Sequence, residues 1–130
     1  MTIDNNGYIN QIDYIVNKLK NEMNSRRALA ITWNPYIDID ENDNYKSVPC
    51  LQYIQFLIRD NKLEMSVMFR SNDILLAYHS NIIGLIVLGE MVAEKLRIKL
   101  NKYTHYIVSA HIYIDRDKSY INKYFSDIIL

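Results

Sequence analysis

The sequence predicts a single α+β domain, residues 1–130, in which helices pack with a mixed, largely antiparallel sheet. Two adjacent nine-residue runs rich in β-branched and aromatic residues are separated by only two residues, as in a β-hairpin. Other segments carry apolar residues at helical spacing. A chain of 130 residues is of ordinary single-domain size and can bury a real core.

The first third of the chain predicts a helix, a strand and a loop. Apolar residues recur every three or four positions over residues 8–23, which predicts an amphipathic helix. Residues 27–33 alternate loosely and predict a strand that Asn34-Pro35 ends. Residues 36–47 are acidic and predict a loop.

The hairpin is the strongest prediction. Residues 51–59 and 62–70 are the two strands, and Asp60-Asn61 between them tolerates the positive φ of a tight turn. A two-residue turn pairs Arg59 with Lys62. A bulge or a longer loop would shift the pairing at the far end by one residue.

With that register, Cys50 falls opposite Ser71, and Leu51 falls opposite Arg70. Opposed side chains have Cβ atoms about 5 Å apart, and a long arginine also reaches diagonal neighbours. The hairpin therefore predicts a thiol beside a guanidinium and a hydroxyl. A nearby fixed positive charge favours the thiolate, which is the nucleophilic form of cysteine.

The second half of the chain predicts a helix, a strand and a closing helix. Residues 81–97 are apolar almost all round up to Ala93, which predicts a central, buried helix capped by Ser80 or Asn81. Residues 103–114 predict one long strand. Aromatic and apolar residues over 120–128 predict the last helix.

Composition excludes several classes of protein. Fifteen basic and fifteen acidic residues balance, so the net charge gives no support to a nucleic-acid or membrane-surface partner. A single cysteine precludes an internal disulfide and fits a reducing cytoplasm, and we expect neither a signal peptide nor a membrane span. Three glycines leave no Gly-rich phosphate loop of the Rossmann or P-loop kind.

We expect no metal site. His79, His105, His111 and Cys50 are the candidate ligands. On one strand, His105 and His111 would lie about 20 Å apart, too far to share an ion.

Five short motifs follow one another in a definite order. They are Asn-Ser-Arg-Arg at 24–27, Val-Pro-Cys at 48–50, Arg-Ser-Asn-Asp at 70–73, Asn81, and Ala-His-Ile-Tyr at 110–113. Taken singly, each has an ordinary structural explanation, such as a buried thiol or a surface ion pair. Taken together, with their spacing, they match a known pattern.

The chain resembles thymidylate synthase and its sister nucleotide hydroxymethylases from about residue 9 to residue 117. Leu51 stands where a His often follows the nucleophile, and Phe69 where a Gln often precedes the Arg. These differences, and Ala-Tyr-His-Ser at 77–80, resemble the archaeal-type branch of the family. The resemblance implies a thymidylate-synthase-like fold, truncated at both ends.

The resemblance also implies roles for individual residues. Cys50 is the expected catalytic nucleophile, and the substrate is a pyrimidine nucleotide monophosphate. The implied substrate-binding residues are Arg70 and Ser71 for the phosphate, Arg26 and Arg27 for the phosphate held by the other subunit of a homodimer, Asp73 and Asn81 for the base, and His111 and Tyr113 for the sugar.

The chemistry suits this set of residues. A thiolate that adds to carbon 6 of uracil makes carbon 5 electron-rich, so a one-carbon group can be placed there. The resemblance implies methylenetetrahydrofolate as the donor of that group. The amide of Asn81 can meet both the N–H and the C=O of uracil, whereas cytosine-specific relatives commonly carry an Asp there. This favours dUMP as substrate.

Three alternatives stay open. Family members are longer, and no residue before Tyr8 matches their N-terminal section, which supplies a further phosphate-binding Arg, a proton-transferring Glu and part of the folate site. The C-terminal segment that closes over folate also has no counterpart. The chain could therefore be a non-catalytic nucleotide-binding or dimerising protein, or one piece of a split enzyme completed by a second polypeptide. A pyrimidine nucleotide hydroxymethylase is the rival within the enzyme class.

Overall fold

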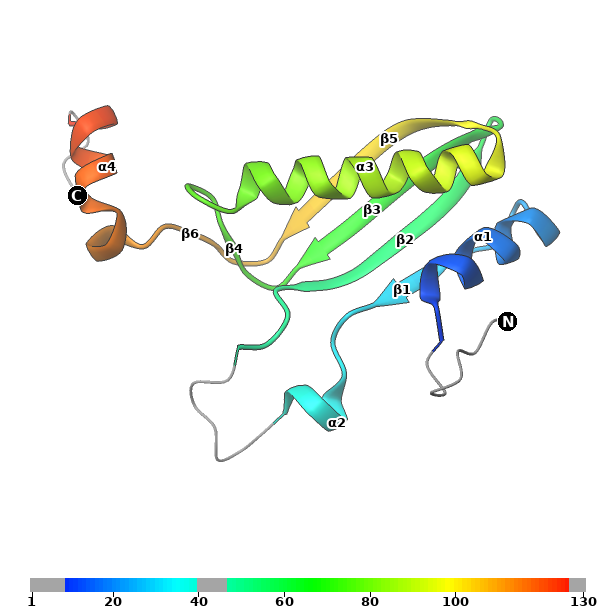
Figure 1. Ribbon diagram of the computed structural model, residues 1–130, viewed down its shortest axis with the longest axis horizontal. Coiled ribbons are helices and arrows are strands. Elements are labelled where there is room, and N and C mark those ends of the chain that lie inside the picture. Colours follow the sequence, from blue (N-terminus) through cyan, green and yellow to red (C-terminus); the bar gives the residue numbers. More distant parts are fainter. Residues whose placement is uncertain (1–8, 40–46, 127–130) are drawn as a thin grey trace.

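The computed structural model describes residues 9–39 and 47–126, which form a main sheet covered on one face by the first and third helices (Figure 1). The helices are α1 (Gln11–Asn21), α2 (Pro35–Asp38), α3 (Tyr78–Leu96) and α4 (Ile114–Tyr124). The strands are β1 (Leu29–Ile31), β2 (Leu51–Arg59), β3 (Lys62–Phe69), β4 (Asn72–Asp73), β5 (Lys99–Ile107) and β6 (Ala110–His111).

The main sheet has the strand order β1-β2-β3-β5. The β1–β2 and β2–β3 pairs are antiparallel, whereas β5 joins β3 in parallel after the crossover through α3. The short strands β4 and β6 form a separate parallel pair. The predicted α+β class, with a mixed and mostly antiparallel sheet, is confirmed.

The core lies between the sheet and the helices α1 and α3. Alternate residues of the hairpin point toward α3, because successive side chains of a strand face opposite sides of the sheet. The apolar side of α1 completes this layer. The buried core includes Ile15, Leu19, Ile54, Phe56, Ile58, Leu63, Met65, Val67 and Val92.

The other face of the main sheet is open in the described chain. Tyr106 is 58% exposed, Ile31 54% and Leu29 39%, all on this side by the strand register. Tyr53 and Met68 on the same side are half-buried. The sheet therefore presents an apolar surface opposite to the helices.

The hairpin follows the prediction closely except at its far end. Asp60 and Asn61 have φ values of 49° and 55°, as a tight two-residue turn requires, and Arg59 pairs with Lys62. A β-bulge between Leu51 and Tyr53 then shifts the register by one residue.

The predicted partners of Cys50 and Leu51 are therefore wrong by one residue. Leu51 pairs with Phe69 instead of Arg70. The backbone N–H of Arg70, not the Ser71 position, lies opposite Cys50 and donates to its carbonyl at 2.9 Å.

The central helix differs from its prediction in two respects. It begins at Tyr78, with Ala77 as N-cap and no side-chain capping bond, so Ser80 and Asn81 lie inside its first turn instead of capping it. It is also buried on one face only, since Ile83 and Met91 are 63% and 50% exposed. Apolar residues all round a helix thus do not mean burial all round in the described chain.

The remaining elements are shorter than predicted or lie elsewhere. The first helix, predicted over 8–23, spans Gln11–Asn21, where the Asn10 side chain accepts from Ile12 and Asp13. The strand predicted over 103–114 is broken at Val108 and Ser109 into β5 and β6. The last helix starts at Ile114, six residues early.

The predicted loop over 36–47 begins with the short helix α2 instead. Asn34-Pro35, predicted to stop a strand, forms the N-cap and first residue of this helix. Three parts of the predicted elements lie outside the described residues: residues 40–46 of the predicted loop, Tyr8 of the first predicted helix, and residues 127 and 128 of the last predicted helix.

Candidate active site

The Cys50 thiol lies beside the Arg70 guanidinium at the open end of the hairpin. Arg70 Nη2 is 3.9 Å from Cys50 Sγ, and the thiol is exposed. The β-bulge shifts the strand register so that Arg70 lies opposite Cys50. The guanidinium therefore contacts the sulfur directly across the two strands.

Backbone carbonyls hold the guanidinium in place. Arg70 Nε donates to the carbonyl of Pro49 at 2.9 Å, and Nη2 donates to that of Val48 at 3.1 Å. A guanidinium has five N–H donors in a rigid fork. In the described chain, both N–H groups of Nη1 make no hydrogen bond and can bind an anion.

A hollow of about 530 Å³ opens next to the thiol. This volume falls within the range of about 300–1,000 Å³ for small-molecule sites. Its walls come from the Cys50 segment, the end of β3 and the first turns of α3. The lining residues are Thr32, Pro49, Cys50, Leu51, Phe69, Ser80, Asn81, Gly84 and Leu85.

The segments 70–73 and 110–113 lie side by side, because β4 pairs with β6. Ser71 Oγ is 3.2 Å from His111 Nδ1, which joins the predicted phosphate and sugar residues directly. The His111 and Tyr113 rings meet edge to face with centroids 4.9 Å apart. His111 ends β6, and Tyr113 is the N-cap residue of α4.

Asp73 is held by Arg116, an arginine outside the predicted set of site residues. Its carboxylate accepts from the backbone N–H groups of Leu75 and Leu76 and from Arg116 Nη2 at 2.5 Å. The Arg116 hydrogen bond is the main reason why the pKa of Asp73 is lowered. The same guanidinium lies 4.5 Å from the Tyr113 ring centroid.

Arg116 therefore ties a predicted base residue to a predicted sugar residue. It also bonds the buried carboxylate of Asp117, with Nε–Oδ1 at 2.7 Å and Nη2–Oδ2 at 2.6 Å. Asp117 and Asp73 together raise the pKa of Arg116. No sequence signal could have revealed this, since Arg116 and Asp73 are far apart in the chain and join through α4 and β4 only in the fold.

Asn81 is the first member of a chain of hydrogen bonds that runs into the protein. Its Nδ2 donates to Asn72 Oδ1 at 3.2 Å, and Asn72 Nδ2 lies 3.2 Å from His105 Nε2. His105 Nδ1 in turn lies 2.7 Å from Tyr103 Oη. The side chain of Asn72 is almost completely buried, at 2% exposure.

The sequence analysis named His105 only as a candidate metal ligand, and Asn72 only as part of the Arg-Ser-Asn-Asp motif at 70–73. The described residues contain no cluster of three or more potential metal-ligating side chains. His105 and Asn72 instead bond each other. The matching parity of Tyr103 and His105 on a strand is the one signal that could have suggested a shared contact.

Arg26 and Arg27 are not part of this arrangement within one chain. Both are exposed in the turn before β1. Leu29, just after them, pairs with Gln55, five residues along β2 from Cys50. That offset is about 17 Å at about 3.4 Å per residue. One copy of the chain therefore brings together Cys50, Arg70 and Asn81, but not the arginine pair.

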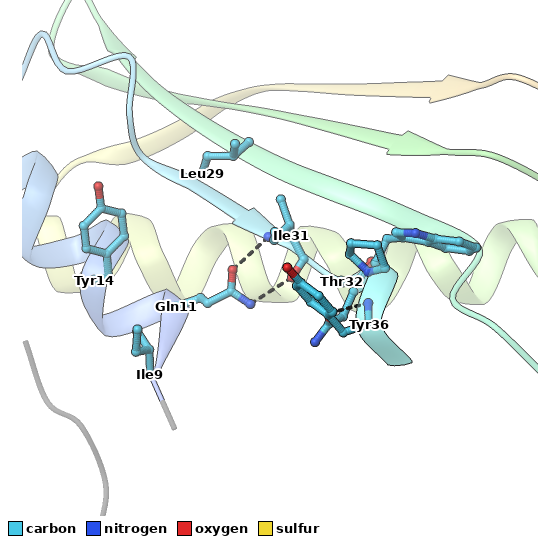
Figure 2. Close-up of a pocket in the computed structure, with 10 residues that line it drawn as sticks. Ile9, Gln11, Tyr14, Leu29, Ile31, Thr32 and Tyr36 are labelled. Atoms are coloured by element: carbon cyan, nitrogen blue, oxygen red, sulfur yellow. Dashed lines mark hydrogen bonds between the residues drawn. The ribbon is translucent and has the colours of Figure 1, made fainter. Parts of the chain in front are cut away.

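A second hollow, of about 790 Å³, lies at the outer edge of the sheet (Figure 2). It is lined mainly by apolar and aromatic residues of α1, β1 and α2, including Tyr14, Ile31 and Tyr36. Gln11 crosses it and bonds both the N–H and the carbonyl of Ile31 at 2.8 Å, so its amide completes the edge strand. It holds none of the predicted site residues.

The helices within residues 9–39 and 47–126 offer no segment with the length and hydropathy needed to span a bilayer.

Comparison with known proteins identifies the family. The thymidylate synthase family model matches residues 2–123. The chain is 59% identical over 122 residues to a Methanocaldococcus jannaschii protein named "Putative thymidylate synthase", covering 93% of this chain. It is 35% identical over 105 residues to a Bacillus licheniformis protein named "Thymidylate synthase", covering 81% of this chain.

A solved structure agrees with this assignment. The thermostable thymidylate synthase A of Bacillus subtilis matches with a TM-score of 0.74 and 30% identity, over 94% of this chain. The chain belongs to the thymidylate synthase family. It spans about half the length of the relatives it matches, with 55% of the Methanocaldococcus protein and 42% of the Bacillus subtilis chain covered.

Proposed function

We propose that the site transfers a one-carbon unit from methylenetetrahydrofolate to carbon 5 of dUMP through a covalent adduct between Cys50 and carbon 6. The 3.9 Å contact between Cys50 Sγ and Arg70 Nη2, at the rim of a hollow that Asn81 also lines, is the observation that carries this proposal. A cation beside the thiol favours the thiolate that such an addition needs.

The remaining residues fit the parts of a nucleotide. The two Nη1 N–H groups of Arg70, which make no hydrogen bond to any described residue, and the hydroxyl of Ser71 suit a phosphate. A phosphate forms charge-assisted and often bidentate bonds with arginine. Ser71 contacts His111, and His111 contacts Tyr113, so a sugar bound by that pair would adjoin the phosphate. Asp73 and Asn81 would serve the base.

We propose that the working unit is a homodimer formed through the open face of the sheet. That face carries Leu29, Ile31 and Tyr106 in exposed positions. Arg26 and Arg27 lie near its edge and far from the Cys50 of their own chain. A second copy packed on this face could bring them to its phosphate site. The free thiol fits a reducing compartment such as the cytoplasm.

A nucleotide-binding protein without turnover is the second candidate, and a chain completed by another polypeptide is the third. The observation that favours both is the coverage of only about half of the related proteins' length. The residues that hold folate and move protons in the longer relatives could then be supplied elsewhere. A hydroxymethylase would use the same adduct with a different final step.

The test is a product assay on the 130-residue chain. Incubation with dUMP and methylenetetrahydrofolate, followed by chromatography and mass spectrometry, is expected to yield dTMP. A hydroxymethylated product would instead assign the hydroxymethylase. No product from the chain alone, but dTMP after addition of a fraction from the native host, would favour the split enzyme. No product in either case would refute the transferase.

A further inference from the structure

The hydrogen-bond chain behind Asn81 has a definite direction. Asn81 donates through Nδ2 to Asn72 Oδ1, so the amide of Asn72 must present its Nδ2 to His105. His105 Nε2 then has to accept, which places the ring proton on Nδ1 and directs it to Tyr103 Oη. Every donor therefore points from Asn81 inward.

The surroundings keep the His105 ring in this orientation. Phe69 stacks on it with centroids 4.7 Å apart and an interplanar angle of 12°. Tyr78 from α3 and Tyr103 from β5 contact it edge-on, at 5.2 and 5.7 Å. These contacts fix the plane of the ring, and the hydrogen bonds to Asn72 and Tyr103 fix which nitrogen faces each partner.

The charge state of the ring agrees with this direction. Burial lowers the pKa of His105, which keeps the imidazole neutral with a lone pair on Nε2. Burial and the neighbouring Tyr78 raise the pKa of Tyr103 to about 12, so its hydroxyl is also neutral. A protonated imidazole would have N–H groups on both nitrogens and could not accept from Asn72.

This direction decides which edge Asn81 can offer to a base. With Nδ2 turned to Asn72, the Asn81 amide has its Oδ1 and one remaining N–H available for the hollow. That pair complements the N–H at position 3 and the carbonyl at position 4 of uracil. Cytosine has an acceptor at position 3 and an amino group at position 4, so binding cytosine would require the Asn81 amide to turn over. Turning it over would set Asn81 Oδ1 against Asn72 Oδ1, two acceptors with no proton between them.

We propose that Asn72 and His105 are positioning residues that make the site select uracil over cytosine by fixing the orientation of the Asn81 amide. This inference rests on the proposed nucleotide site, and it adds a selection mechanism that lies outside the hollow. Asn72 and His105 touch no substrate in this account, since neither lines the hollow.

The affinity ratio of dUMP to dCMP tests the proposal, because the two nucleotides share phosphate and sugar and differ only at the base. Calorimetric titration of the 130-residue chain is expected to favour dUMP by about tenfold or more, since a wrongly paired buried polar group is costly. A matched pair of variants separates the hydrogen bond from the shape of the side chain. Asn72→Asp can only accept from Asn81 and, once the His105 ring proton moves to Nε2, also accepts from His105, so it should keep the preference. Asn72→Leu, of similar size, should bring the ratio close to one.

A third variant and one spectrum complete the test. His105→Phe preserves the stacking on Phe69 but removes the acceptor for Asn72, so it should also lower the ratio toward one. Nitrogen NMR of the wild-type ring is expected to show the proton on Nδ1. A proton on Nε2, or an unchanged ratio in both Asn72→Leu and His105→Phe, would overturn the inference while leaving the nucleotide site intact. Absence of any nucleotide binding would instead refute the proposed function, and base selection with it.

Discussion

Arg70 is the residue on which the candidate site depends most. Three of its N–H groups hold the segment before Cys50 and the thiol itself, and the two on Nη1, unbonded within residues 9–39 and 47–126, are available for a phosphate. A lysine keeps the charge but loses the fork that makes these contacts together. The charge alone is therefore not sufficient for this geometry.

We predict that Arg70→Lys weakens dUMP binding by about 1.5–3 kcal/mol, the typical value of a hydrogen bond to a charged group. Calorimetric titration measures this loss. Arg59→Lys is the matched control, because Arg59 lies at the turn end of the same hairpin and, among the described residues, its side chain bonds only the neighbouring Ile58 carbonyl. Equal effects of the two substitutions would contradict the assigned role of Arg70.

Arg116 is a second residue with a testable role, because it holds the carboxylate of Asp73. Its hydrogen bond lowers the pKa of the Asp73 carboxyl, so Arg116→Gln should raise that pKa toward the ordinary value of about 3.9. Because the folded pKa lies below the unfolded one, the wild-type carboxylate stabilises the fold above about pH 4 and loses this effect as the pH falls through the folded value. Carbon NMR of the Asp73 carboxyl follows the titration. An unchanged midpoint in the variant would show that Arg116 does not hold Asp73.

At the scale of elements, the helix α3 offers a matched pair of glycines. A Cβ at Gly84 would meet no atom within 4 Å, whereas at Gly89 it would lie 2.9 Å from Met65 Sδ and 3.1 Å from Leu100 Cδ2. Gly89 thus lets α3 approach the strands β3 and β5 closely.

We predict opposite effects of alanine at these two positions. Gly84→Ala should raise the free energy of unfolding by about 0.5–1 kcal/mol through helix propensity. Gly89→Ala has the same propensity gain but overpacks the core, so it should be less stable than Gly84→Ala by about 1–3 kcal/mol. Urea denaturation of both variants gives this difference. Equal stabilities would mean that α3 does not pack tightly on the sheet.

The elements also explain which predictions from sequence succeeded. The hairpin was predictable because its turn and its alternation are local properties of residues 51–69. The β-bulge near Leu51 was not predictable, since no residue pattern in this segment indicates where an extra residue interrupts the strand pairing. Helix ends depend on tertiary contacts, and α3 starts at Tyr78 without a side-chain cap.

In the candidate site, too, some contacts were predictable from the sequence and others were not. The proximity of Cys50 and Arg70 follows from a hairpin that the sequence predicts, even though the exact register was wrong. The contacts of Asp73 with Arg116 and of Asn72 with His105 join segments more than thirty residues apart. Such contacts depend on how β4, β5 and α4 come together, which local patterns do not determine.

At the scale of the whole molecule, the separation of the arginine pair from Cys50 has a direct consequence. If Arg26 and Arg27 bind the phosphate in the other subunit, a dimer has two sites, each built from both chains. A variant that lacks Cys50 and a variant that lacks both arginines would then be defective for different reasons.

Mixing these variants should restore function. Cys50→Ala and the double variant Arg26→Ala/Arg27→Ala are each expected to form little adduct with a uracil nucleotide, whereas a re-equilibrated mixture should recover about one competent site per mixed dimer. Sedimentation of the wild-type chain should show a dimer at micromolar concentration. A monomer, or a mixture no better than its parts, would contradict the shared site.

The covalent step can be tested directly by weighing the protein. The 130-residue chain is incubated with 5-fluoro-dUMP, with and without methylenetetrahydrofolate, and its intact mass is measured. We predict a mass gain equal to the bound nucleotide, or to nucleotide plus folate, in the wild type and none in Cys50→Ala. Tight, reversible dUMP binding with no mass gain under either condition would contradict the role of Cys50 as a nucleophile.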